Sequence, residues 1–121
     1  MDIKTVASVL GAQILTPGVD LTREVYWAYG ADLLSDVLAY TQPQTLLLTG
    51  LINNQVIRTA EMVDLGGIVV VRGKIVQPEF IALAEQANIP LLFTEKTMYE
   101  CCGKLFIAGL KPCEKRSNHH V

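Results

Sequence analysis

The sequence predicts a small single-domain α/β fold, in which a mostly parallel sheet of four or five strands is covered by helices. Three short apolar runs begin at residues 45, 68 and 89, a repeat of about 22 residues that accommodates one strand, one helix and two loops. The runs are apolar throughout, as is typical of strands buried on both faces of a parallel sheet. Amphipathic segments separate them, and this alternation implies right-handed crossovers with helices on the sheet.

The first quarter of the chain predicts one helix and two strands. Residues 2–10 carry apolar side chains at helical spacing, and Gly11 ends that helix. Residues 14–18 read as a brief strand that closes in a Pro-Gly turn. Residues 24–29, EVYWAY, are rich in aromatic and β-branched residues and therefore predict a second strand, which Gly30 breaks.

Two amphipathic helices flank the first apolar run, the strand expected over residues 45–50. A helix is expected over residues 32–40, and its apolar face comprises Leu33, Leu34, Val37 and Leu38. A second helix is expected over residues 53–64, and its apolar face comprises Val56, Ile57, Ala60 and Val63.

The remaining chain continues the alternation of strand and helix. Strands are expected over residues 68–73 and 89–93, and a helix over residues 77–88 has proline at its first position. A last helix over residues 97–109 begins with a capping box of threonine and glutamate. Its apolar face comprises Met98, Cys101, Cys102, Leu105 and Phe106. The domain is thus expected to span residues 1–110, and residues 111–121 form a polar C-terminal tail.

Composition excludes several classes of function. Only 18% of the 121 residues are charged while half are apolar, so we expect apolar surface to be buried against a second copy in a homodimer. A net charge of -2 argues against a nucleic-acid binder or a protein attracted to anionic membranes. No apolar run is long enough to span a bilayer, and the N-terminus lacks a signal peptide, so a cytoplasmic location is expected.

The glycine-ended loops after the predicted strands are the candidate ligand site. In open α/β sheets, ligands bind at the carboxyl ends of the strands. Helix-capping asparagines and basic side chains follow these strands, and together they could hold a phosphate or carboxylate. The candidate ligand-binding residues are Thr49, Gly50, Asn53, Asn54, Arg72, Gly73, Lys74 and Thr94. Ordinary turns and solvated charges would produce the same pattern, and both interpretations stay open.

The sequence offers no convincing catalytic centre. Gly73-Lys74 is not a P-loop, because Ile75 stands where a hydroxyl is needed. Both histidines lie in the tail, and Glu95 is the one carboxylate expected at the strand ends, the others being expected to face water. Cys101 and Cys102 lack the spacing of metal or redox motifs, although a nucleophilic role for either thiol remains an alternative. We therefore expect no catalytic residue, no metal site and no cofactor.

The order of these motifs resembles the DRTGG domain, a small α/β module that is also similar to the N-terminal domain of HPr kinase/phosphorylase. The resemblance covers roughly residues 20–107 and is strongest over residues 77–94, QPEFIALAEQANIPLLFT. The family takes its name from Asp-Arg-Thr after one strand and Thr-Gly-Gly after the next. These places read Leu51-Ile52-Asn53 and Arg72-Gly73-Lys74 here, so only the glycine is retained.

The resemblance implies a regulatory or ligand-sensing role, because relatives are regarded as modules without an established reaction. In HPr kinase the phosphate-binding catalytic loop belongs to a separate domain, so the resemblance gives no ground for kinase activity. The leading hypothesis is a non-catalytic, homodimeric module that binds a small anionic or nucleotide-like ligand at the carboxyl ends of its strands. The alternative hypothesis is an interaction subunit that docks on a larger partner enzyme, such as a redox complex.

Overall fold

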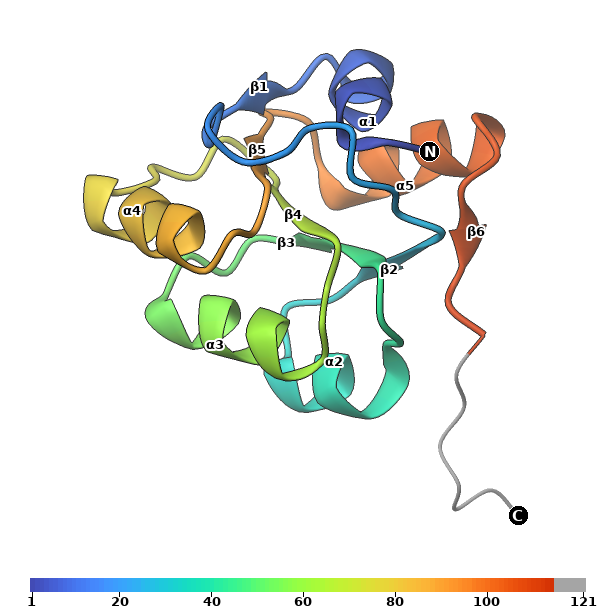
Figure 1. The fold of residues 1–121 in the computed structure, drawn as a ribbon. Coiled ribbons are helices and arrows are strands. Elements are labelled where there is room, and N and C mark those ends of the chain that lie inside the picture. The colour runs from blue at the N-terminus through green and yellow to red at the C-terminus, as the bar shows by residue number, and fades with distance from the viewer. Residues whose placement is uncertain (115–121) are drawn as a thin grey trace.

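The computed structural model describes residues 1–114, which form five helices and six strands (Figure 1). The helices are α1 (Ile3–Leu10), α2 (Leu34–Tyr40), α3 (Asn54–Met62), α4 (Pro78–Gln86) and α5 (Met98–Ile107). The strands are β1 (Gln13–Ile14), β2 (Trp27–Gly30), β3 (Thr45–Thr49), β4 (Gly67–Val70), β5 (Leu91–Phe93) and β6 (Lys111–Pro112).

All six strands form one sheet in the order β1-β5-β4-β3-β2-β6. Every neighbouring pair from β5 to β6 is parallel, and only β1 runs antiparallel, beside β5. The predicted α/β fold with a mostly parallel sheet is therefore confirmed. Because the parallel strands point the same way, the loops after β2, β3, β4 and β5 meet at one edge of the sheet, called the carboxyl edge below.

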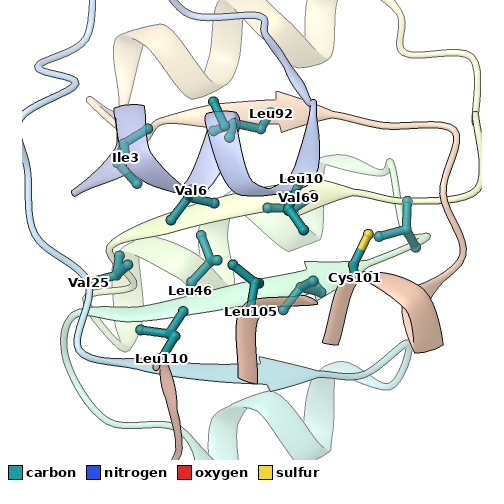
Figure 2. Close-up of a cluster of buried hydrophobic side chains, with 13 residues drawn as sticks. Ile3, Val6, Leu10, Val25, Leu46, Val69, Leu92, Cys101, Leu105 and Leu110 are labelled. Atoms are coloured by element: carbon teal, nitrogen blue, oxygen red, sulfur yellow. The ribbon is translucent and has the colours of Figure 1, made fainter. Parts of the chain in front are cut away.

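Helices cover both faces of the sheet. Successive residues of each buried strand point to opposite sides, so a strand that is apolar throughout presents an apolar surface on each face. Leu46 and Leu48 of β3 pack with α1 and α5 in one buried cluster (Figure 2). Leu47, between them, packs with α2, α3 and α4 on the other face. A strand buried on both faces must be apolar throughout, which is the pattern that made the central strands recognisable from sequence.

The helix ends follow the predicted signals. Asp2 caps α1 by accepting a hydrogen bond from the Thr5 N–H at 2.8 Å, and Gly11 ends that helix with a left-handed φ of 62°. Thr97 caps α5, with its hydroxyl accepting from the Glu100 N–H at 3.2 Å. Within residues 1–114, no helix combines the length and the apolar character needed to cross a bilayer.

Two predicted apolar faces are partly wrong. Leu33 and Leu38 are 58% and 40% exposed, and Val37 is the buried residue of α2. The helix begins only at Leu34, so Leu33 lies on extended backbone before it and is not part of the buried side of the helix. In α5, Phe106 is likewise exposed, because only one side of this helix rests on the sheet.

The ends of the sheet also differ from the prediction. The strand predicted over residues 14–18 stops after Ile14, because Thr16 turns the chain and accepts a hydrogen bond from the Leu91 N–H at 2.9 Å. Lys111 and Pro112, predicted to belong to a polar tail, form β6 and pair with β2. Residues 115–121, the rest of that predicted tail, lie outside the described residues.

Candidate functional site

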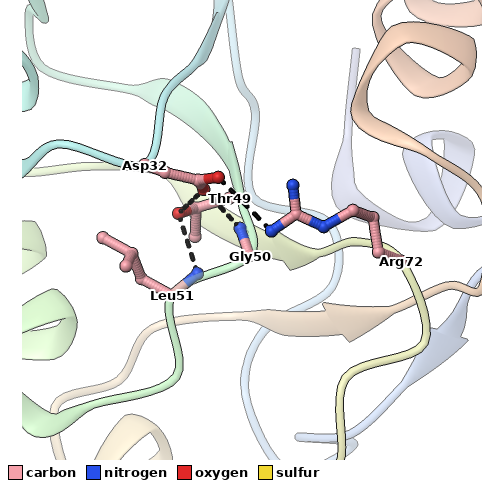
Figure 3. Close-up of polar contacts among 5 residues, drawn as sticks. All are labelled: Asp32, Thr49, Gly50, Leu51 and Arg72. Carbon is pink, nitrogen blue, oxygen red and sulfur yellow. Dashed lines mark hydrogen bonds and ion pairs between the residues drawn. The ribbon is translucent and has the colours of Figure 1, made fainter.

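The carboxyl edge holds a polar cluster built from three loops that are distant in sequence (Figure 3). Asp32 comes from the loop after β2, Thr49 and Gly50 from the end of β3, and Arg72 from the loop after β4. Parallel pairing of β2 with β3 and of β3 with β4 places these three loops side by side. The sheet thus brings together Thr49, Gly50 and Arg72 of the predicted ligand-binding residues.

The Asp32 carboxylate lies at the centre of this cluster. Its Oδ1 accepts hydrogen bonds from the Gly50 N–H at 2.7 Å and from the Thr49 hydroxyl at 3.0 Å. Its Oδ2 forms an ion pair with Nη2 of Arg72 at 3.3 Å. The Thr49 oxygen in turn accepts from the Leu51 N–H at 3.1 Å, which fixes the hydroxyl proton on the side of Asp32. A backbone N–H, a hydroxyl and a guanidinium therefore converge on one anionic group.

The backbone of the loop after β4 sets the direction of the Arg72 side chain. Arg72 has a φ of 67°, in the left-handed region, and its N–H donates to the carbonyl of Lys96 at 2.8 Å. The Gly73 N–H donates to the carbonyl of Thr94 at 3.0 Å, so this loop is also tied to the loop after β5. The turn directs the guanidinium back across Gly50.

Gly50 is needed for this arrangement. A Cβ atom at position 50 would overlap the Arg72 guanidinium, so any larger residue would move that side chain away from Asp32. The glycine that ends β3 therefore both exposes its N–H to an anion and leaves room for the cation beside it.

The charges of the cluster balance one another locally. The pKa of Asp32 lies below its usual value of 3.8, first because the Gly50 N–H donates to the carboxylate, and further because of Thr49 and the positive charge of Arg72. The side chains of Arg72 and Asp32 are 43% and 40% exposed, so water screens the ion pair and its contribution to stability is modest.

Asp32 was missed as a site residue, because it was expected to lie beside a helix and to face water. The structure corrects this: Asp32 precedes α2 but turns inward across the end of β3. The one sequence cue is its place two residues after Gly30, the end of β2, and this cue alone does not separate Asp32 from the other carboxylates near helix starts. The expected rim carboxylate, Glu95, lies beside Gly73 at the same edge and is exposed.

The other predicted positions serve local roles or lie apart from the cluster. The side chain of Asn53 caps α3 by accepting from the Gln55 N–H at 3.0 Å, while Asn54 is exposed in the first turn. Thr94 is buried, and its hydroxyl accepts from the Lys96 N–H at 3.2 Å. Lys74, which follows Gly73, is exposed and lines a separate shallow hollow of about 230 Å³.

The two thiols of α5, Cys101 and the half-buried Cys102, are poorly suited to nucleophilic chemistry. Cys101, on the buried side of α5, packs in the core cluster that also contains α1 (Figure 2), and burial raises its pKa to about 11. Burial also raises the pKa of Cys102. Among residues 1–114, no group of three or more histidine, cysteine, aspartate or glutamate side chains is placed to hold a metal ion.

Comparison with known proteins finds similarity to solved structures. No family model matches the sequence, and no curated protein matches it either. The fold is similar to the CBS and DRTGG domains of the regulatory region of Clostridium perfringens pyrophosphatase, solved in complex with its activator, diadenosine tetraphosphate. The TM-score is 0.66 at 12% identity, over 99% of this chain and 52% of that chain.

At this identity the likeness shows a shared fold. The chain spans about half the length of that regulatory region. The likeness supports the predicted resemblance to a DRTGG-containing fold, whereas the predicted similarity to HPr kinase stays a prediction.

Proposed function

We propose that the chain is a non-catalytic, homodimeric regulatory module whose carboxyl edge binds a small anionic, nucleotide-like ligand. The observation that carries the proposal is the convergence of the Gly50 N–H, the Thr49 hydroxyl and the Arg72 guanidinium on one carboxylate. These are the donors that bind phosphate oxygens in other proteins. The similar fold of a regulatory region solved with a nucleotide activator supports the same class of ligand.

In this proposal the Asp32 carboxylate occupies the position of the ligand's anionic group. A phosphate oxygen can accept the same hydrogen bonds, so binding exchanges one anion for another and leaves no donor unsatisfied. Asp32 lies in the short segment between β2 and α2 and is partly exposed, which gives its side chain room to turn toward solvent. Ligand binding would thereby be coupled to the start of α2, which supplies a regulatory response.

Larger ligands would extend from the cluster toward the remaining predicted positions. Asn54, in the first turn of α3, and Lys74, in the same loop as Arg72, are both exposed. A ligand with several phosphates could reach them, while a single phosphate would contact only the cluster.

Calorimetric titration with inorganic phosphate, ATP and diadenosine tetraphosphate tests the proposal. We expect Arg72→Ala to weaken binding by about tenfold, the effect of losing one charge-assisted contact. Asp32→Ala should strengthen it by a similar factor, because the competing carboxylate is gone. Arg58→Ala, which removes an exposed arginine from α3, is the matched control and should bind as the wild type does.

The contrary result is equally clear. If neither the wild type nor Asp32→Ala binds any of the three ligands at millimolar concentration, the donors hold Asp32 for structural reasons alone. The ligand-sensing role would then be abandoned.

A second candidate function is an interaction subunit that docks on a partner enzyme. The exposed apolar side of α5 favours it, since Tyr99 and Ile107 are 90% and 87% exposed. Purification from the native host at low ionic strength distinguishes the two: a stoichiometric partner enzyme supports docking, and a chain recovered with copies of itself alone supports sensing.

A further inference from the structure

We propose that one face of α5 is the surface through which two copies of this chain associate, with their α5 helices crossing antiparallel near Gly103. The proposal rests on the homodimer in the proposed function and assigns it a surface. The α5 face is defined as Tyr99, Gly103, Phe106 and Ile107.

The α5 face is an apolar stripe on the side of the helix that points away from the core. Cys101 and Leu105 are buried against the sheet (Figure 2), whereas Tyr99, Phe106 and Ile107 are 90%, 68% and 87% exposed. Positions 99, 103, 106 and 107 have the three- and four-residue spacing of one helical face. The other large exposed apolar residues, Tyr26, Leu33, Leu38, Met62 and Ile75, are distributed over several other elements.

Apolar surface continues from the α5 face onto the neighbouring strands. A hollow of about 170 Å³ lies between α5 and the strands β2 and β6. Its walls include Tyr29, Cys102, Phe106 and Pro112. Phe106 therefore belongs both to the stripe and to the hollow, and the two together form a contiguous apolar area that a partner could cover.

Gly103 allows a second helix to approach closely. A Cβ atom at this position would meet no atom within 4 Å, so the centre of the stripe is a flat spot between bulky side chains. Small residues at a helix crossing let two backbones come together while the larger neighbours interdigitate. In an antiparallel crossing at Gly103, Tyr99 of one copy lies opposite Ile107 of the other, four residues to either side of the crossing point.

The charged residues beside the stripe favour a second copy of the chain as the partner, with its α5 helix antiparallel. Glu100 and Lys104 lie on the same flank of α5, and neither forms an ion pair with another residue of the range 1–114. Antiparallel crossing brings Glu100 of each copy close to Lys104 of the other, so two-fold symmetry creates the favourable pair twice. A parallel crossing would place this charged flank against the apolar flank that carries Cys102.

Sedimentation of the full chain tests the proposal. At micromolar concentration we expect sedimentation of the wild type to give a molecular mass of twice the 13.3 kDa of one chain. Ile107→Asp and Phe106→Asp should each raise the dimer dissociation constant at least about tenfold. Met62→Asp, at an apolar side chain that is 73% exposed on α3, is the matched control and should leave the dimer intact. Circular dichroism should show unchanged helix content in all three variants.

Charge exchange and cross-linking test the geometry. Glu100→Lys and Lys104→Glu should each weaken the dimer, and the double variant should restore it because both symmetric pairs reform. In a background with Cys102→Ser and Cys113→Ser, Gly103→Cys should give a disulfide-linked dimer under mild oxidation, and Met62→Cys should not.

Two results would overturn the proposal, and they are distinguishable from failure of the ligand site. A wild type that stays monomeric at all micromolar concentrations refutes the homodimer. A dimer that survives Ile107→Asp and is not cross-linked through position 103 refutes the α5 face while leaving the homodimer standing. Ligand titrations with the Arg72 and Asp32 variants test the ligand site alone, so their outcome does not depend on whether the α5 face forms a dimer.

Discussion

Replacing Asp32 with asparagine tests whether the charge of this side chain holds the loops of the carboxyl edge together. Asparagine keeps the size and an oxygen that can accept from the Gly50 N–H, but it loses the charge that faces Arg72. Hydrogen bonds to charged groups contribute about 1.5–3 kcal/mol when well shielded. Since the Asp32 side chain is 40% exposed, we expect the free energy of unfolding to fall by only about 1 kcal/mol, or about 4 °C in Tm.

The pH dependence of this difference identifies the carboxylate as its source. The pKa of Asp32 in the folded chain is lowered, chiefly by the Gly50 N–H, so the charged form stabilises the fold. That contribution is fully present above the unfolded-state pKa of about 3.9 and is lost as the pH falls through the lower folded-state pKa. The difference between wild type and Asp32→Asn should therefore be largest near neutral pH and vanish in strong acid.

Urea unfolding at about pH 7 and at about pH 2.5 measures this difference directly. Asp2 and Asp20 also have lowered pKa values, and comparing the variant with wild type at each pH cancels their shared contribution. Glu95→Gln is the control, because that carboxylate lies at the same edge and accepts no hydrogen bond from another residue of the range 1–114. A difference that is equal at both pH values, or absent at neutral pH, would refute the assigned role of the charge.

Three further predictions concern the core, the turn after β1 and the thiol of Cys101. Leu48→Ala removes a fully buried side chain of β3 and should lower the free energy of unfolding by about 3 kcal/mol in urea denaturation. Thr16→Val keeps the volume of the side chain but removes the hydroxyl that accepts from the Leu91 N–H. It should lower the free energy of unfolding by about 1–2 kcal/mol and speed hydrogen exchange at the Leu91 amide. Cys101 should react with a thiol reagent at neutral pH about 100-fold more slowly than a free cysteine, because its pKa is raised to about 11. Rapid labelling would revive a nucleophilic role.

The central fold could be predicted because its physical cause leaves a strong pattern. Strands buried on both faces, such as β3 and β4, must be apolar at every position, and the helices between them must be amphipathic. Strands β1 and β6 leave no such pattern, because each has two residues and depends on a neighbour already in place. The burial of α2 was overestimated for a similar reason: periodicity shows which side of a helix is apolar and does not show how much of it the sheet reaches.

The candidate site was predictable in position but not in its internal contacts. The rule that ligand sites follow the strands found Thr49, Gly50 and Arg72. The partner of these three, Asp32, comes from a loop 40 residues before Arg72. Only the parallel pairing of three strands brings the two together, so no local sequence signal distinguishes Asp32 from the other carboxylates near helix starts.

Both outermost strands of the sheet are very short, and this limits how the chain can meet other molecules. Neither β1 nor β6 offers more than two residues as a template for a further strand, and Pro112 has no N–H to donate. Short edge strands of this kind disfavour lateral growth of the sheet into fibrils and the recruitment of a peptide by strand addition. They favour recognition through side chains displayed by loops and helices, where single substitutions can change the choice of partner without disturbing the backbone ladder.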